Sequence, residues 1–316
     1  ESMALFDEGD AGGDVDHNIA MGYQAFTGAD LSSNDRQVVG NLAIGSFALN
    51  STGANACTGT IAIGYNALTS LTDGTANTVI GYSAMDAATT ENYNTVMGYN
   101  AGGDMRNDAS DHNVIIGYEA GVGGTEYTTS CVAIGSQAFL NQGNIGVADS
   151  VAIGRGAMGG GWTSSPTDKC IAIGTNALGT GTKNSANSNV AIGYKALEDV
   201  TTGDDNIGIG SYAGDDISSG SRNVCIGHSA GHQMNANYNT LIGAYAGDTL
   251  TTGEENTIIG YDCDTASNDN QNNIIIGNHL TATDVNNSVF IGNNTNHIQN
   301  DFNADATWNY SSDERQ

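Results

Sequence analysis

The segment 189–197 reads Asn189-Val-Ala-Ile-Gly-Tyr-Lys-Ala-Leu197, and sixteen variants of this phrase run through the 316 residues of the chain. Their central glycines lie 15 to 23 residues apart, 18 on average. A short period of this kind is typical of a solenoid, because no single repeat can bury its own apolar face and each must pack on its neighbours. The central glycines are Gly22, Gly45, Gly64, Gly81, Gly98, Gly117, Gly135, Gly154, Gly174, Gly193, Gly210, Gly227, Gly243, Gly260, Gly277 and Gly292.

The apolar residues of the phrase predict one short strand per repeat. Ile (14 copies) or Met (two copies) precedes the glycine, and two residues earlier the chain has Ile, Leu or Val in 12 copies and Thr in four. Residues two apart share one face of a strand. Pairs such as Ile61 and Ile63 should therefore stack into ladders, which we expect to form the inner seam of the solenoid. The residue between them varies from Ala to Phe290, so the opposite face is less tightly specified.

Small and polar positions complete the repeat. Gly can adopt positive φ or let another backbone approach closely, as a sharp bend in each coil requires. Ala stands three residues after the glycine in 13 copies, which predicts a second buried row. Asn stands four residues before it in 11 copies and can hydrogen-bond between stacked coils. The structural core of the repeat is represented by Ile63, Gly64, Ile153, Gly154, Ile192 and Gly193.

These features predict an all-β fold, a parallel β-roll or β-helix of about 16 coils with a period of about 18 residues. Each coil is expected to hold two short strands and a variable loop. A coil of that size encloses little volume, and a single thin roll would leave one face of the apolar ladder in water. Burial of that face at a threefold axis removes the exposure, so we expect a homotrimer around a common axis.

The repeat pattern changes near the C-terminus. The recurring Ala is replaced by Cys263, Leu280 and Thr295 in the last three copies, and the closing residues carry no repeat. A solenoid needs such a cap to cover its open end. We therefore divide the chain into an N-terminal lead-in, a repeat shaft, atypical last coils with a cap, and a transition segment, which are residues 1–17, 18–260, 261–300 and 301–316.

The composition argues against several classes of partner. Eight Lys and Arg stand against 35 Asp and Glu, a net charge of −27. Nucleic-acid binding needs clustered basic residues, so we expect none, and an anionic membrane surface would repel the chain. No stretch reaches the ~20 apolar residues of a membrane span, so we expect no membrane insertion. The acidity instead suggests a solvated outer surface or one that binds divalent cations.

Candidate chemical sites are few. Asp262, Asp264 and Asp269 could contribute to a calcium site, since hard cations prefer several oxygen ligands, and calcium is the one cofactor that the sequence suggests. His228 and His232 are four apart, a spacing that suits a metal only on a helix, and in this repeat we expect them to be solvent-facing turn residues. The acidic loops single out no pair of carboxylates for glycoside hydrolysis, so we expect no enzyme.

The cysteines are expected to be structural. Their number, five, is odd, and no CxxC spacing occurs, which argues against a disulfide framework and against a zinc site. We expect all of them to be small buried residues: Cys57, Cys131, Cys170, Cys225 and Cys263.

The phrase resembles the head repeat of trimeric autotransporter adhesins, and similar repeats occur in many phage tail fibres. The resemblance is carried by copies such as Asn189–Leu197 and Ser150-Val-Ala-Ile-Gly-Arg-Gly-Ala157. It implies a trimeric, left-handed parallel β-roll. The repeat of this chain is longer than the usual adhesin repeat, which leaves the loop geometry open.

The C-terminal segment carries a second resemblance. Tyr310-Ser-Ser-Asp-Glu-Arg315 is similar to the opening of the intramolecular chaperone domain that ends many phage tail spikes and fibres, with Ser312, Asp313 and Arg315 in matching order. The resemblance implies that residues 301–316 lead into such a chaperone and that Ser312 is the nucleophile of its self-cleavage when the full domain is present. Ser312 alone is no catalyst, because its hydroxyl needs an adjacent base.

Together the resemblances imply the structural or receptor-binding segment of a trimeric viral tail fibre, a part of the virion that mediates host attachment. The expected partners are further copies of the chain, a glycan or protein of the host surface, and other tail proteins. Two alternatives stay open: a cellular trimeric adhesin or extracellular surface filament, and a polysaccharide-degrading tail spike. We expect any receptor site in the variable loops or in the cap after Tyr261.

Overall fold

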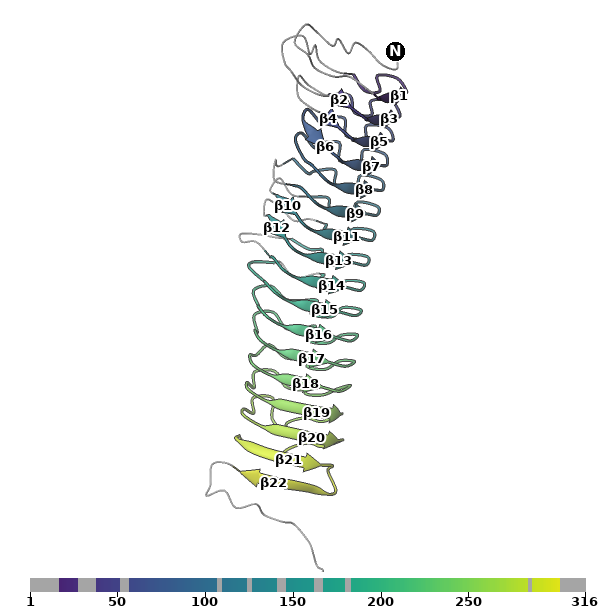
Figure 1. Ribbon diagram of the computed structural model, residues 1–316. Coiled ribbons are helices and arrows are strands. Elements are labelled where there is room, and N and C mark those ends of the chain that lie inside the picture. The colour runs from purple at the N-terminus through teal and green to yellow at the C-terminus, as the bar shows by residue number, and fades with distance from the viewer. Residues whose placement is uncertain are drawn as a thin grey trace, which may run out of the picture. The chain divides into compact units, whose positions relative to one another are not determined.

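The computed structural model describes residues 17–27, 38–51, 57–106, 110–123, 127–140, 146–161, 167–179, 183–283 and 286–301. These residues form strands and turns, and none of them is helical. The chain divides into two units, residues 1–168 and 169–316. Within each unit the strands stack as a parallel β-solenoid with one main strand per repeat (Figure 1). The predicted all-β repeat solenoid is therefore confirmed.

In the first unit the main strands pair in parallel, each with the strand of the next repeat. Some coils add a second, two-residue strand, and these pair in parallel in two further small sheets. The main strands are β1 (Ile19–Met21), β3 (Leu42–Ile44), β5 (Ile61–Ile63), β7 (Thr78–Ile80), β8 (Thr95–Met97), β9 (Val114–Ile116), β11 (Val132–Ile134) and β13 (Val151–Ile153). The second strands are β2 (Val38–Val39), β4 (Cys57–Thr58), β6 (Gly74–Thr75), β10 (Thr128–Thr129) and β12 (Val147–Ala148).

In the second unit the main strands again pair in parallel, and the last strand turns back to pair antiparallel with the one before it. The strands lengthen from three residues to five as the repeat pattern changes. They are β14 (Ile171–Ile173), β15 (Val190–Ile192), β16 (Ile207–Ile209), β17 (Val224–Ile226), β18 (Thr240–Ile242), β19 (Thr257–Tyr261), β20 (Ile274–Asn278), β21 (Ser288–Gly292) and β22 (His297–Asp301).

The two faces of each main strand differ from the expected arrangement. The middle residue, for example Ala62 or Leu241, is fully buried, whereas the flanking pair, for example Ile61 and Ile63, is only half-buried. The prediction that the pairs form the inner seam is therefore wrong for the single chain. The interior of a coil this thin has room for one inward residue per strand, and that is the variable one. Its size varies because the turns that face it vary too.

A sharp turn follows each main strand, and glycine is required there. Gly193 has a φ of +140°, and a Cβ at this residue would lie 2.4 Å from the carbonyl oxygen of Gly210 in the next coil. Backbone N–H groups of one turn donate in part to the preceding coil and in part to the following coil. The N–H of Tyr212 donates to Tyr194 of the preceding coil, and that of Gly214 donates to Ala230 of the following coil, both at 2.9 Å. Each turn therefore ties a coil to both of its neighbours.

The predicted asparagine row is a buried ladder that links the coils. In Asn206 the Oδ1 atom accepts the backbone N–H of Asn223 at 3.0 Å, and the Nδ2 atom donates to the carbonyl of Gly220 at 2.8 Å. Asn223 bonds in the same way to Asn239 and Ala236. Both side chains are fully buried. Because each amide satisfies a backbone donor and a backbone acceptor of the next coil, the ladder stabilises the stacking.

Candidate functional site

The outward face of the main strands is apolar and partly open to solvent. Ile171, Ile173 and Ile192 are 36–37% exposed, and Ile274 and Ile276 reach 38–39%. The outward pairs of neighbouring strands are in register, for example Ile173 with Ile192, so they form continuous apolar ladders within each unit. Soluble monomers rarely expose contiguous apolar patches larger than a few hundred Å². This face therefore has the character of an interface.

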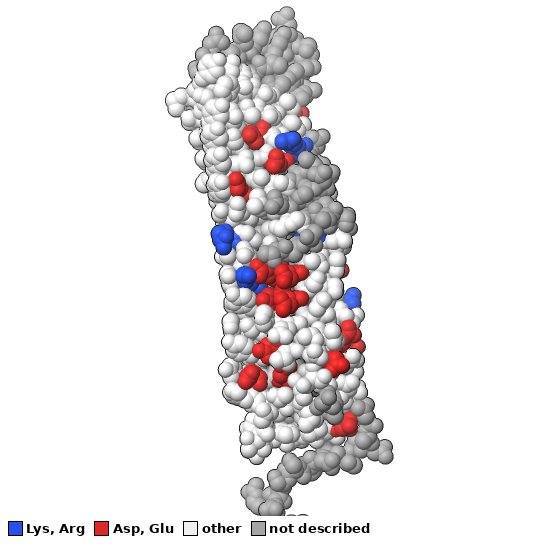
Figure 2. All heavy atoms as spheres, turned by 180° about the vertical axis from the view of Figure 1, so that it is seen from behind, with Lys and Arg blue, Asp and Glu red and all other residues white. Residues whose placement is uncertain are grey.

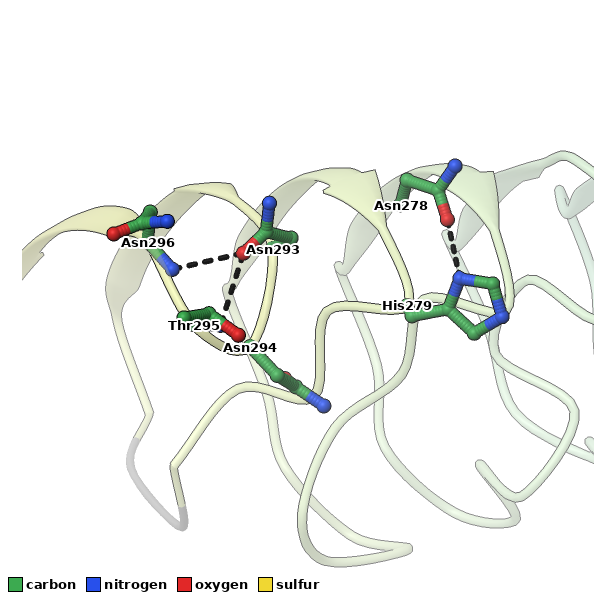
Figure 3. Close-up of a pocket in the computed structure, with 6 residues that line it drawn as sticks. All are labelled: Asn278, His279, Asn293, Asn294, Thr295 and Asn296. Carbon is green, nitrogen blue, oxygen red and sulfur yellow. Dashed lines mark hydrogen bonds between the residues drawn. The ribbon is translucent and has the colours of Figure 1, made fainter.

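A polar pocket lies at the C-terminal end of the second unit (Figure 3). Its volume is about 550 Å³, within the range of roughly 300–1,000 Å³ that small-ligand sites occupy. It is built by the end of β20 with the turn that follows, and by the turn that joins β21 to β22. Because β20 and β21 pair with Gly277 opposite Gly292, the residues after these two glycines lie side by side. The pocket is lined by Asn278, His279, Asn293, Asn294, Thr295 and Asn296.

Internal hydrogen bonds hold three of the pocket's four side-chain amide oxygens in place. Oδ1 of Asn293 accepts the backbone N–H groups of Thr295 and Asn296 at 2.9 and 2.8 Å, and Oδ1 of Asn294 accepts that of Thr281 at 2.7 Å. Oδ1 of Asn278 accepts a hydrogen bond from Nδ1 of His279. These bonds orient the amides, because an amide whose oxygen is anchored has its nitrogen direction fixed as well.

An aromatic pair and one carboxylate border the pocket. The His279 ring lies against the exposed ring of Tyr261 with a centroid distance of 4.8 Å and an interplanar angle of 70°. Nε2 of His279 is 3.7 Å from Oδ2 of Asp262. Both side chains are exposed, so this contact contributes little to stability. The rings of Tyr261 and His279 place an apolar surface beside the neutral amides of the pocket.

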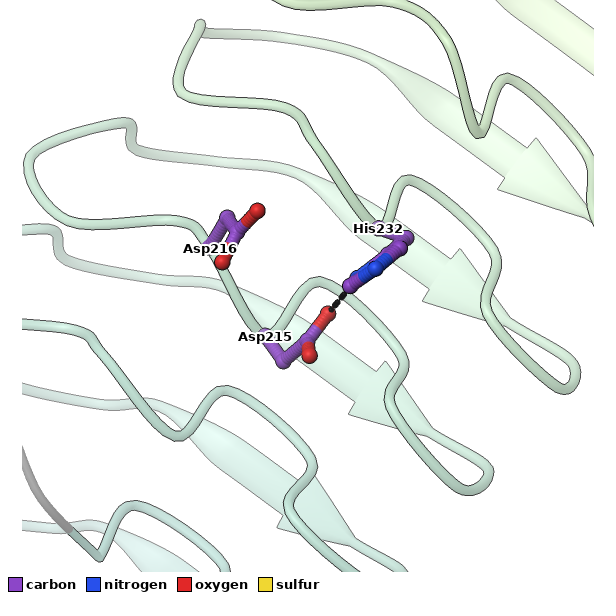
Figure 4. Close-up of side chains that lie close together, drawn as sticks. All are labelled: Asp215, Asp216 and His232. Carbon is purple, nitrogen blue, oxygen red and sulfur yellow. Dashed lines mark hydrogen bonds and ion pairs between the residues drawn. The ribbon is translucent and has the colours of Figure 1, made fainter.

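A second cluster joins two successive coils of the second unit (Figure 4). Asp215 and Asp216 lie in the turn after β16, and His232 lies in the turn after β17 with its Nδ1 atom 2.5 Å from Oδ1 of Asp215. One ligand atom from each of the three residues lies within 4.8 Å of the others. An imidazole nitrogen with carboxylate oxygens could hold a divalent transition metal. In the described structure Nδ1 of His232 is already engaged by Oδ1 of Asp215.

Burial and pairing act on this cluster in opposite directions. Burial raises the pKa of the Asp215 carboxyl, and the hydrogen bond and charge of His232 reduce that rise without reversing it. The same hydrogen bond raises the pKa of His232.

Acidic side chains gather in groups on the face seen from behind, with few basic ones among them (Figure 2). One basic residue, Lys195, has its Nζ atom 2.8 Å from Oε2 of Glu198 within the turn after β15.

A buried carboxyl lies at the boundary with the cap. Asp264 accepts hydrogen bonds from the backbone N–H groups of Thr249 and Thr265 and from the Thr249 hydroxyl. Burial raises the pKa of Asp264 to about 6, and these hydrogen bonds oppose the rise. Burial also raises the pKa of Asp248, whose side chain interacts with Asp264. The two carboxyl groups therefore retain a proton more readily than ordinary surface acids.

A column of tyrosines stands on the exposed side of the first unit. Tyr65, Tyr82, Tyr99 and Tyr118 stack with centroid distances of 5.1, 5.3 and 5.5 Å and interplanar angles of 7–17°. Each ring is 42–51% exposed. Because the rings cover one another's faces, they present edges to solvent. A sugar or base that needs a free aromatic face therefore finds none between the coils, and the column is better suited to aligning the coils.

The predicted calcium residues do not form one site. Asp262 lies opposite His279, Asp264 is buried among threonine donors, and Asp269 accepts a hydrogen bond from Ser267 at 2.5 Å. Among the described residues, the three-residue cluster with metal-binding geometry is the one around Asp215. The sequence places Asp215 and His232 at the same position, five residues after their repeat glycines. This shared position indicates a contact only once the two coils are known to stack.

The remaining site predictions divide into three groups. His228 is exposed as expected, with its ring 5.2 Å from that of Tyr245, whereas His232 is half-buried and paired. All five cysteines are buried thiols, and burial raises the pKa of the Cys57, Cys131 and Cys225 thiols to about 12. Ser312 lies outside the described residues, as do most of residues 301–316 and residues 1–16.

A buried lysine was missed by sequence reasoning. Lys183 takes the place that Val200 and Ile217 take in the following coils, and its Nζ atom donates to the carbonyl of Val200 at 2.8 Å. Burial lowers the pKa of Lys183 to about 8, while Asp199 partly opposes this shift. Repeat alignment shows a polar residue at an apolar position, but it cannot reveal the carbonyl that receives it.

The chain matches no protein-family model, no curated protein and no solved structure. No helix in the described part of the chain is long and apolar enough to cross a membrane.

Proposed function

We propose that this chain is a structural and host-recognition segment of a trimeric viral tail fibre, located in the virion. Three copies would associate through the outward face of the repeat strands, and exposed turns and the cap would contact the host surface. Three equivalent sites raise avidity through effective concentration, so weak individual contacts suffice.

The outward face is the observation that supports the assembly. The residues at its two positions are Ile, Leu, Val, Met or Thr in all sixteen copies, although the chain contains 35 Asp and Glu. A strand face that stayed in water would have no reason to exclude charged residues, yet none of the 35 Asp and Glu occurs at these two positions. Burial of half-exposed isoleucines against a partner gains roughly 25 cal/mol per Å² of apolar surface.

The regular period favours copies of the same chain as the partner. A surface whose apolar rows recur in register at every coil is best covered by a second surface with the same rows. Further copies supply this surface, and three around one axis leave no copy with an open face. The trimeric arrangement also agrees with the adhesin and fibre repeats that the sequence resembles. The viral setting rests on the similarity of Tyr310–Arg315 to the start of a tail-spike chaperone.

Light scattering on the purified chain tests the assembly. We expect a mass near three times 32.4 kDa. The double variant Ile192→Asp and Ile226→Asp places two charges on the outward face of β15 and β17, and it should shift the mass to that of a monomer with an unchanged far-UV circular dichroism spectrum. Gln233→Asp adds a charge to an exposed turn of the same unit and should leave the trimer intact. A monomeric wild type would refute the proposal.

Antibody labelling tests the viral setting independently. Antibodies against the chain should label the tails of virus particles whose genome encodes it, as seen by electron microscopy. Labelling of a cell surface instead would favour the adhesin alternative. Release of reducing sugar from capsular polysaccharide would favour the tail-spike alternative.

A further inference from the structure

We propose that the pocket in the C-terminal cap binds a neutral saccharide. This inference rests on the proposed function, because it names the ligand class through which the fibre would recognise a host surface. The pocket is the six-residue site formed by the turn after β20 and the turn between β21 and β22.

The pocket has free donors that point in fixed directions. The side-chain oxygens of Asn278, Asn293 and Asn294 are held by bonds within the cap. Among the described residues no group accepts a hydrogen bond from the Nδ2 atoms of these three amides or of Asn296. All four residues are exposed. A ligand that supplies acceptor oxygens at these positions would find donors already oriented, which reduces the entropy that binding costs.

The charge of the lining selects the ligand class. Its six residues are four Asn, one Thr and one His. With no carboxylate in the lining, a hard cation lacks its preferred ligands, and with no Lys or Arg, a phosphate lacks its usual partners. The net charge of −27 further disfavours anionic sugars. Hydroxyl, ring and N-acetyl oxygens of a neutral sugar fit donors of this kind, and sugar hydroxyls can in turn donate to the Thr295 hydroxyl or to imidazole nitrogen.

The aromatic pair beside the pocket suits the same ligand. Tyr261 is 47% exposed, and its ring lies against His279 at the border of the lining. One face of a pyranose ring is a row of C–H groups, which can pack on an exposed aromatic surface while the hydroxyls bond to the amides. The stacked tyrosines of the first unit lack this combination, because neighbouring rings cover one another's faces.

The departure from the repeat falls at these residues. The position directly after the repeat glycine is Tyr in seven copies, and it is Asn in only the last two, Asn278 and Asn293. The following position is His279 and Asn294 in these copies. A cap needs only polar residues to end a solenoid. Three asparagines whose side-chain oxygens are anchored, and whose nitrogens have no acceptor among the described residues, go beyond that need.

Binding of the full chain to printed neutral hexose and N-acetylhexosamine oligosaccharides tests the inference, with sialylated and uronic-acid oligosaccharides as the charged comparison. We expect binding to neutral sugars alone. Asn278→Asp and Asn294→Asp keep the anchored oxygen but replace the free donor by a charged acceptor, and each should weaken binding at least about tenfold. Ser211→Asp adds the same charge directly after a repeat glycine of an inner coil and should bind like the wild type.

The outcomes separate this inference from the proposed function. Absence of binding to every neutral sugar, preference for charged sugars, or unchanged binding by both Asn variants would overturn the saccharide assignment. The mass of each sample is measured in parallel. A trimer without sugar binding overturns the inference alone, whereas a monomer that binds neutral sugars overturns the assembly and leaves the pocket assignment in place.

Discussion

The same side chain has opposite roles in the inner coils and in the cap. Asn206 and Asn223 in the coils are fully buried, and both ends of each amide bond to the next coil. Asn293 and Asn294 in the cap are exposed, with the oxygen anchored and no described acceptor for the nitrogen. The difference lies in the position within the repeat: Asn206 and Asn223 stand four residues before the repeat glycine, whereas Asn293 and Asn294 stand one and two residues after it.

This contrast shows how a repeat divides its residues between stacking and recognition. In an inner coil the next coil uses the amide atoms of these buried asparagines, so their donors are not available to a ligand. At the end of the stack one neighbour is replaced by the antiparallel strand β22, and polar groups of the last turns become available. Substitutions in the coils should therefore lower the stability of the fold, whereas substitutions in the cap should weaken ligand binding.

Gly193→Ala should give the largest effect. A Cβ at this position would lie 2.4 Å from the Gly210 carbonyl oxygen, and the φ of +140° is unfavourable for alanine. We expect a loss of more than about 5 kcal/mol in the free energy of unfolding, or failure to fold. Gly59→Ala is the matched control, because its φ is +64° but no atom lies within 4 Å of the added Cβ. That change should cost only about 1–2 kcal/mol. Urea denaturation measures both, and equal losses would contradict the close-approach argument.

Asn223→Ala should give the next largest effect. It leaves the backbone N–H of Asn239 and the carbonyl of Ala236 without their partner in a buried ladder. Each buried unsatisfied group costs about 1–3 kcal/mol, so we expect a loss of roughly 3–5 kcal/mol. The cap counterpart Asn296→Ala removes an exposed side chain and should change stability by less than about 0.5 kcal/mol. Similar losses for the two variants in urea denaturation would remove the distinction between coil and cap asparagines.

The smallest of these effects is a pH dependence at the boundary between coils and cap. The pKa of Asp264 is about 6 in the folded chain against 3.8 when unfolded, so the folded state binds more protons between these values. The free energy of unfolding should therefore decrease as pH rises from about 4 to 6 and then level off, by roughly 2–3 kcal/mol at most. Denaturation midpoints of wild type and Asp264→Asn, compared at pH 4.5 and 7.5, isolate this contribution.

A second variant checks the cause of that dependence. Thr249→Val removes the hydroxyl that donates to the ionised Asp264 carboxylate, so the pKa of Asp264 should rise and the upper limit of the pH window should move upward. An Asp264→Asn variant with the same pH dependence as the wild type would show that other groups cause it.

Much of the fold followed from the periodicity of the chain. The glycines at positive φ, the row of buried alanines such as Ala67, and the asparagine ladder were all predicted from their spacing, because each position has one role that recurs in every coil. The prediction of which strand face lies inside was wrong: side-chain alternation shows that Ile61 and Ile63 share a face, but it does not show on which side the chain closes.

The candidate site was less predictable for the same reason. The sequence indicated the cap after Tyr261 as a place for recognition, through the loss of the repeat, but the pocket depends on the pairing of Gly277 with Gly292. The contact between Asp215 and His232 joins residues 17 apart and exists only because their coils stack.

The sequence by itself determined the architecture of this protein, since a repeat with one strand and one obligatory glycine per coil has few ways to bury its apolar residues. Only the tertiary structure decided which face is inside and which polar atoms stay free. Both depend on how the neighbouring coil closes over each residue. That contact is absent from any single repeat, and it changes where the stack ends.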